Sequence, residues 1–180
     1  IMIPLSIPNI SGNEWKYVKD CLDSGWISSA GEYVNKFEEA IQNYTGTKYA
    51  IACMNGTAGL QVSLNLAGVS RNDIVLAPNL TFVATLNAIS YSGTQIVLID
   101  VSEDTWQIDV DLLQKWLENN SITKIVDGKP LTTEKITGKK IGAILPVYVL
   151  GGFIDVERLV EISSTYGIPL IEDSTEALGS

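Results

Sequence analysis

The sequence predicts an α/β protein in three layers (αβα), with helices on both faces of a mostly parallel β-sheet. Along the 180 residues, segments with apolar residues at helical spacing alternate with short, continuously apolar segments. Continuously apolar strands are typical of parallel sheets, because helices bury such sheets on both faces. The last apolar segment is followed by Asp173, and open α/β sheets bind ligands beyond the carboxyl ends of their strands.

The composition describes one globular domain, which we expect over residues 1–180. The formal net charge of −9 argues against nucleic-acid binding, because phosphate backbones require clustered Lys and Arg. The chain has no histidine, so a His-based triad is excluded and a zinc or other transition-metal site is not expected. No leader segment and no apolar run approaching ~18 residues is present, so we expect a cytoplasmic protein without a membrane span.

The pattern of apolar residues in the first part of the chain predicts two amphipathic helices and a buried strand. The helices are expected over residues 12–24 and 33–44, with a loop at 26–31 between them. The strand is expected over residues 49–53, where Cys53 would be a small buried hydrophobe.

The rest of the chain predicts a regular succession of helices and strands. The expected strands cover residues 74–77, 95–100, 141–149 and 168–172, and the expected helices cover 60–66, 81–90, 110–117 and 155–166. Only Asn119–Lys140 departs from the pattern, because this segment is polar and carries Asp127-Gly128 as a turn signal. We expect it to form a surface excursion, with Ile122–Val126 and Leu131-Thr132 as the arms of an exposed hairpin.

Small residues join the 49–53 strand to the next helix and suggest a phosphate cradle at Gly56, Thr57 and Ala58. They let a ligand approach the backbone, while the N–H groups and the dipole of the helix favour an anion. Ordinary capping of the helix by Asn55 or Thr57 explains the same residues equally well.

Two further features lie at neighbouring carboxyl ends of the sheet. Phe82 follows one strand and is placed to stack on a planar ligand, although a core Phe on the next helix is the simpler interpretation. Asp173 follows the last strand and is placed to pair with a protonated ring nitrogen, with Glu176 three residues later to bond another ring substituent. The alternative for Asp173 is a helix cap. Cradle, stacking ring and acid together fit pyridoxal phosphate.

The order and spacing of these residues resemble the DegT/DnrJ/EryC1/StrS family of nucleotide-sugar aminotransferases, which are fold-type-I pyridoxal phosphate enzymes. The similarity extends over nearly the whole chain. It includes Ser24–Gly31, Phe37-Glu38, Asn55–Ala58, Thr81–Thr85, Leu145–Val147 with Leu150-Gly151, and Glu172-Asp173 with Gly179. The resemblance implies that residues 1–180 are the N-terminal part of the large cofactor-binding domain and that a C-terminal domain lies beyond them.

Within this family the chain is most similar to 4-aminotransferases that act on nucleotide-linked 4-keto-6-deoxy sugars of the legionaminic-acid or perosamine type. The resemblance implies that glutamate donates an amino group to the 4-keto carbon of such a sugar, for surface-polysaccharide synthesis. It also implies a homodimer, with Trp26, Ile27, Ser28 and Ser29 near a sugar-nucleotide site that the partner subunit completes.

The resemblance assigns a role to each candidate cofactor residue. Backbone N–H groups of Gly56, Thr57 and Ala58, with the Thr57 hydroxyl, would hold the phosphate, and Phe82 would stack on the ring. The pyridine nitrogen would pair with Asp173 and the ring hydroxyl with Glu176, where many relatives have Gln.

The sequence departs from the family pattern in two ways. Tyr148 stands where relatives have His, which puts any proton-handling role of that position in doubt. The family's Schiff-base lysine is expected beyond Ser180, and the lysines present are interpreted as solvated surface residues. Two alternatives remain: a dehydratase of the same family, in which His replaces that lysine, and a truncated, non-catalytic fragment.

Overall fold

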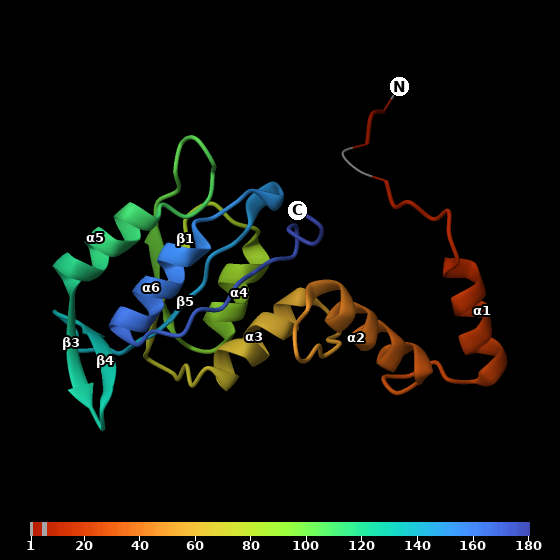
Figure 1. Ribbon diagram of the computed structural model, residues 1–180, viewed down its shortest axis with the longest axis horizontal. Coiled ribbons are helices and arrows are strands. Elements are labelled where there is room, and N and C mark those ends of the chain that lie inside the picture. Colours follow the sequence, from red (N-terminus) through yellow and green to blue (C-terminus); the bar gives the residue numbers. More distant parts are fainter. Residues whose placement is uncertain (1, 5–6) are drawn as a thin grey trace. The chain divides into compact units, whose positions relative to one another are not determined.

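The computed structural model of the protein describes residues 2–4 and 7–180, and its contacts divide the chain into two compact units (Figure 1). One unit comprises Ile1–Ala52 and the other Cys53–Ser180. The larger unit contains the parallel sheet and the candidate cofactor residues.

The smaller unit consists of two helices, α1 (Glu14–Ser24) and α2 (Glu32–Thr45), which confirms both predicted helices. A glycine in the left-handed conformation follows each helix, which is a common way for helices to end. The rings of Tyr17 and Tyr33 lie 5.1 Å apart and join the helices, and the Tyr33 hydroxyl donates to Asp20. Neither helix has a buried residue, so the apolar faces of both remain open within this unit.

The larger unit is built on a parallel sheet in the order β2-β1-β5. The strands are β1 (Ile74–Pro78), β2 (Gln95–Ile99) and β5 (Ile141–Ile144). The predicted strand at 168–172 appears as a parallel extension beside β5, joined by single bridges between Ile144 and Leu170 and between Val147 and Asp173. The strands predicted at 74–77, 95–100 and 141–149 are confirmed, with β5 shorter than expected.

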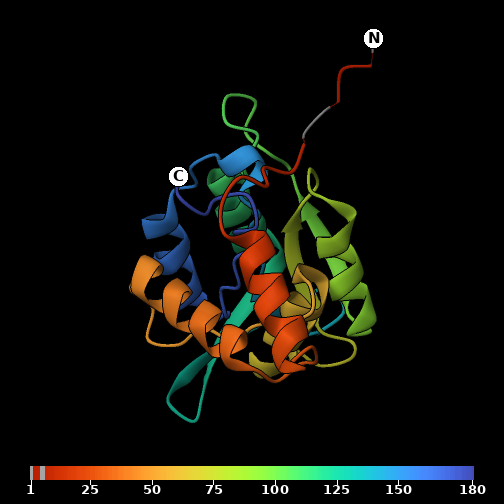
Figure 2. The same ribbon diagram turned by 90° about the vertical axis from the view of Figure 1, so that its right-hand side faces the viewer.

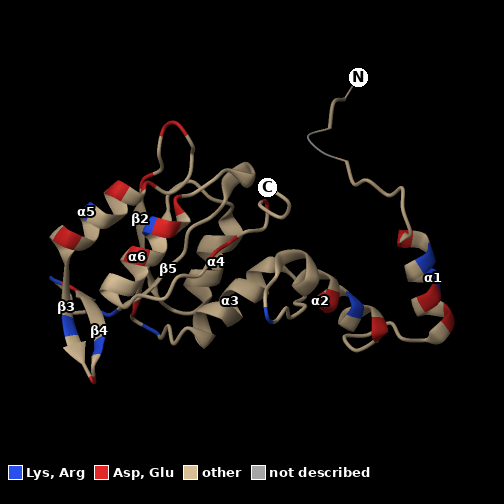
Figure 3. Cartoon of the chain, viewed as in Figure 1, with Lys and Arg blue, Asp and Glu red and all other residues tan. Residues whose placement is uncertain are grey.

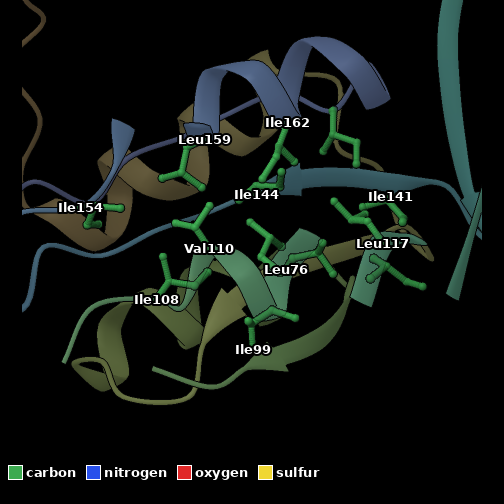
Figure 4. Packing of buried hydrophobic residues seen from close by; sticks show 13 residues of the cluster. Leu76, Ile99, Ile108, Val110, Leu117, Ile141, Ile144, Ile154, Leu159 and Ile162 are labelled. Atoms are coloured by element: carbon green, nitrogen blue, oxygen red, sulfur yellow. The ribbon is translucent and has the colours of Figure 1, made fainter. Parts of the chain in front are cut away.

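Helices cover both faces of this sheet, as the sequence predicted (Figure 2). One face packs against α5 (Val110–Asn120) and α6 (Val156–Tyr166), and the other against α3 (Gly56–Leu66) and α4 (Val83–Tyr91). Side chains of β1 alternate between the two cores, because successive residues of a strand point to opposite faces. Ile74 and Leu76 point toward α5 and α6, where bulky aliphatic side chains interlock (Figure 4).

The polar segment after α5 forms the predicted hairpin, with strands β3 (Ser121–Val126) and β4 (Lys129–Glu134). Asp127 and Gly128 both have positive φ, which matches the tight turn that such dipeptides favour. The hairpin is anchored at its base, where the buried Thr132 donates to the Tyr166 carbonyl. A short 3-10 turn, η1 (Val149–Gly151), lies between β5 and α6.

The prediction of a buried strand at residues 49–53 is wrong. These residues form neither a helix nor a strand, and Tyr49, Ile51 and Cys53 are exposed. An apolar run predicts burial, but a strand also needs a neighbouring strand in register, and the sheet of this unit is built from β1, β2 and β5. Cys53 is therefore not the buried hydrophobe that the sequence predicted.

Candidate cofactor site

Asp173 lies at the carboxyl end of the sheet and is buried, with 9% of the residue exposed. Its backbone N–H donates to Pro146, and its carbonyl accepts from the N–H of Tyr148. One carboxylate oxygen accepts from the Thr85 hydroxyl at 2.7 Å, and the other accepts from the Thr175 hydroxyl at 2.6 Å. Residues 174–180 form turns, so the helix-cap interpretation of Asp173 is wrong.

The surroundings of this carboxylate contain donors but little charge. Helices α3 and α4, which cover this face of the sheet, have no charged side chain (Figure 3). None of the ion pairs found among residues 2–4 and 7–180 includes Asp173. The Thr175 N–H also donates to this carboxylate, at 3.3 Å. A buried carboxylate is costly without a compensating charge, and these neutral donors offset only part of that cost. The arrangement therefore favours a cationic ligand.

The N-terminus of α3 lies next to the donors of Asp173. A side chain placed on Gly56 would have its Cβ 3.8 Å from the Thr175 hydroxyl oxygen, so the backbone passes close to that group. Asn55 caps the helix by accepting from the Ala58 N–H at 2.9 Å, which confirms the capping interpretation for Asn55. Because the first N–H groups of a helix have no acceptor in the helix, those of Gly56 and Thr57 can serve an anion. Ala58 would have to share its N–H with the cap.

Phe82 is the residue that precedes the first turn of α4, and its side chain is 75% exposed. The interpretation of Phe82 as a core residue is therefore wrong. Its carbonyl accepts from the N–H of Thr85, so the exposed ring and the donor to Asp173 belong to the same helical turn. Stacking on a ligand remains a prediction.

Glu176 is engaged by the backbone rather than by other side chains. Its carboxylate accepts from the Leu150 N–H at 2.6 Å, and Leu150 has the left-handed φ of 54° that is uncommon for residues other than glycine. A Cβ on Gly151 would lie 2.8 Å from the Glu176 carbonyl oxygen, so this turn packs closely on the last segment of the chain. The predicted contact of Glu176 with a ring hydroxyl remains a prediction.

The loop that was predicted to contact the sugar nucleotide belongs to the smaller unit. Trp26, Ile27 and Ser28 line an open groove of about 1720 Å³ beside α1 and α2, and Ser29 is exposed next to them. The remaining predicted site residues lie in the larger unit, so the role of this loop remains a prediction.

The structure shows polar contacts near the candidate site that the sequence did not single out. Thr85 and Thr175 both donate to Asp173. Thr85 is distant from Asp173 in the sequence, and Thr175 reaches Asp173 only through the turn that follows it, so neither contact could be predicted from the sequence. Gln107 is 2% exposed, and its amide bonds both the N–H and the carbonyl of Val149. Gln107 lies in the connection between β2 and α5, and nothing local in the sequence marks it as buried.

The part of the chain that the structure describes offers neither a metal site nor a membrane span. It brings together no group of three His, Cys, Asp or Glu side chains that could hold a metal ion. None of its helices combines the length and apolar character needed to cross a membrane. Lys140, which adjoins β5, lies at the opposite end of the sheet from Asp173 and pairs with Asp73 at 3.5 Å.

Comparison with known proteins identifies the family. The model of the DegT/DnrJ/EryC1/StrS aminotransferase family matches residues 8–180, and the chain belongs to this family. It is 36% identical over 178 residues to the GDP-perosamine synthase of Escherichia coli O157:H7, covering 99% of this chain and 43% of that protein. It is 32% identical over 177 residues to the UDP-4-amino-4-deoxy-L-arabinose–oxoglutarate aminotransferase of Shewanella sediminis, covering 98% and 40%.

The fold agrees with this assignment. The structure of ntda from Bacillus subtilis with bound cofactor PMP matches with a TM-score of 0.75 and 25% identity, over 92% of this chain and 33% of that chain. The chain thus spans less than half the length of the relatives that it matches. The predicted fold class, that of fold-type-I aminotransferases, is confirmed.

The hydrogen bond from Thr85 to Asp173 should contribute to the free energy of unfolding. Thr85→Val removes a donor from a buried carboxylate without changing the shape of the side chain, so we expect the free energy of unfolding to fall by about 1–3 kcal/mol. Denaturant unfolding of the protein measures this. Thr85→Ser is the control, because it keeps the hydroxyl and should lose much less; equal losses in both variants would contradict the role of the hydroxyl.

Proposed function

We propose that this chain forms the cofactor-binding part of a pyridoxal phosphate-dependent sugar aminotransferase. The observation that carries the proposal is the buried carboxylate of Asp173, which two threonine hydroxyls hold on an uncharged face of the sheet. A protonated pyridine nitrogen would supply the positive charge that this site favours. The membership of the family supports the same cofactor.

The neighbouring residues fit the other parts of this cofactor. The N–H groups of Gly56 and Thr57, with the Thr57 hydroxyl, would bind the phosphate, and the Ala58 N–H would take part if Asn55 released it. The net charge of −9 makes such local donors necessary, because the overall field repels an anion. The exposed ring of Phe82 would stack on the pyridine, and Glu176 would reach the ring hydroxyl.

In the proposed reaction, bound pyridoxal phosphate supplies the electron sink through which an amino group can be transferred. Asp173 keeps a proton on the ring nitrogen. Thr85 and Thr175 fix the carboxylate in place, so that it needs little reorganisation during the reaction. Phe82 sets the plane of the ring. We assign the residue that bonds the cofactor covalently to the part of the protein beyond Ser180.

We further propose that glutamate donates the amino group and that the acceptor is the 4-keto carbon of a nucleotide-linked 4-keto-6-deoxy sugar. The names of the two relatives, a perosamine synthase and an oxoglutarate aminotransferase of a 4-amino sugar nucleotide, support this choice. In this proposal the enzyme is a cytoplasmic homodimer, and the loop of Trp26, Ile27, Ser28 and Ser29 contacts the sugar nucleotide.

The cofactor assignment predicts that Asp173→Asn weakens pyridoxal phosphate binding by about 10- to 100-fold, because the charge-assisted bond to the ring is lost while the side chain keeps its size. An absorbance titration of the whole protein with the cofactor measures this. Asp104→Asn is the control, since Asp104 is exposed in a loop and should leave affinity unchanged. An unchanged dissociation constant in Asp173→Asn would refute the assignment.

The reaction predicts a labelled product. The whole enzyme, given ¹⁵N-glutamate and a nucleotide-linked 4-keto-6-deoxy sugar, should yield a sugar nucleotide with ¹⁵N at carbon 4, as seen by mass spectrometry and NMR. A product that has lost a hydroxyl group and contains no nitrogen would instead identify a dehydratase.

A further inference from the structure

Tyr148 follows β5 and bonds the segment that carries Asp173 in two ways. Its backbone N–H donates to the Asp173 carbonyl at 3.1 Å, and its hydroxyl donates to the Glu172 carboxylate at 3.0 Å. One residue therefore holds both the backbone and a side chain of the neighbouring segment.

The side chain of Tyr148 lies on the face of the sheet opposite to the Asp173 carboxylate. Val147, which pairs with Asp173, packs in the core beneath α3 and α4, and Asp173 contacts Thr85 of α4 on that same face. The ring of Tyr148 packs instead against the core formed with α5 and α6. A ligand paired with the Asp173 carboxylate is therefore separated from the Tyr148 ring by the sheet itself.

The ionisation of Tyr148 also makes it unsuited to transfer protons. Burial, together with the hydrogen bond to the Glu172 carboxylate and its charge, raises the pKa of Tyr148 to about 12. The phenol thus stays protonated, and stays a donor, throughout the neutral range. The bond to Glu172 would be lost only as the pH rises toward that value.

The segment that Tyr148 holds ends the parallel ladder beside β5. Three backbone hydrogen bonds precede that of the Tyr148 N–H: Ile144 N–H donates to Pro169, Ile171 N–H to Ile144 and Asp173 N–H to Pro146, and turns follow. The end of such a ladder opens more readily than its centre. Thr85 restrains this end from the α4 side, and the Tyr148 hydroxyl restrains it from the other side.

We propose that Tyr148 is a positioning residue, which braces the Asp173 segment from the face opposite to the cofactor. That the position so fixed serves a cofactor rests on the function proposed above; the brace itself is a property of the fold. In this proposal Tyr148 does not handle protons; it holds the segment that carries Asp173.

The test compares two tyrosines in the whole protein. Tyr148→Phe keeps the ring and removes the hydroxyl, and Tyr166→Phe is the matched control. The Tyr166 ring packs against the same core, and in the described structure its hydroxyl has no bond to residues 168–176. We expect amide hydrogen exchange of residues 168–176 to accelerate about three- to tenfold in Tyr148→Phe, with the β3–β4 hairpin unchanged. We expect pyridoxal phosphate affinity to fall by a similar factor.

A second variant, Glu172→Ala, removes the acceptor and keeps the test decisive if Tyr148→Phe fails to fold. It should reproduce the effect of Tyr148→Phe, and the double variant should add little, because both remove the same bond. Exchange that is as slow in Tyr148→Phe and Glu172→Ala as in Tyr166→Phe would overturn the brace. Faster exchange in the two variants, together with a wild-type protein that binds no pyridoxal phosphate, would leave the brace standing and refute the proposed function. Faster exchange with unchanged cofactor affinity would overturn the positioning role alone.

Discussion

A carboxylate that is held out of water at the end of a strand is the constraint on which the rest of this site depends. Asp173 can be buried because Thr85 and Thr175 donate to its two oxygens. These donors come from α4 and from the last turns of the chain, so both elements must be fixed against the sheet for the charge to be tolerated. The N-terminus of α3, at Gly56, lies beside one of the same donors.

The two faces of the sheet differ in the side chains and helices that cover them. Toward α5 and α6 the sheet is covered by bulky aliphatic side chains that supply most of the large buried residues, such as Leu76 and Leu159. Toward α3 and α4 the core residues are smaller and the helices carry no charged side chain. The larger core and the proposed cofactor site thus lie on opposite faces of one sheet, and Tyr148 bonds the segment that carries Asp173 from the face of the larger core.

The sequence was sufficient wherever local patterns determine structure. Periodicity placed the helices, Asp127-Gly128 placed the hairpin turn, and the position of Asp173 after an apolar run placed the acid at the sheet edge. It was insufficient where partners are distant: Thr85 and Asp173 are 88 positions apart, and no local pattern reveals that contact. The strand predicted at residues 49–53 failed for the same reason, because an apolar run does not specify a neighbouring strand.

The central claim is that Asp173 is buried in order to keep a proton on a ring nitrogen. Nitrogen NMR of the whole protein loaded with pyridoxal phosphate that is ¹⁵N-labelled in the ring reports that proton directly. We predict a protonated ring nitrogen that persists at mildly alkaline pH in the wild type and is lost in Asp173→Asn. An unprotonated nitrogen in the wild type, or the same protonation in both proteins, would contradict the account.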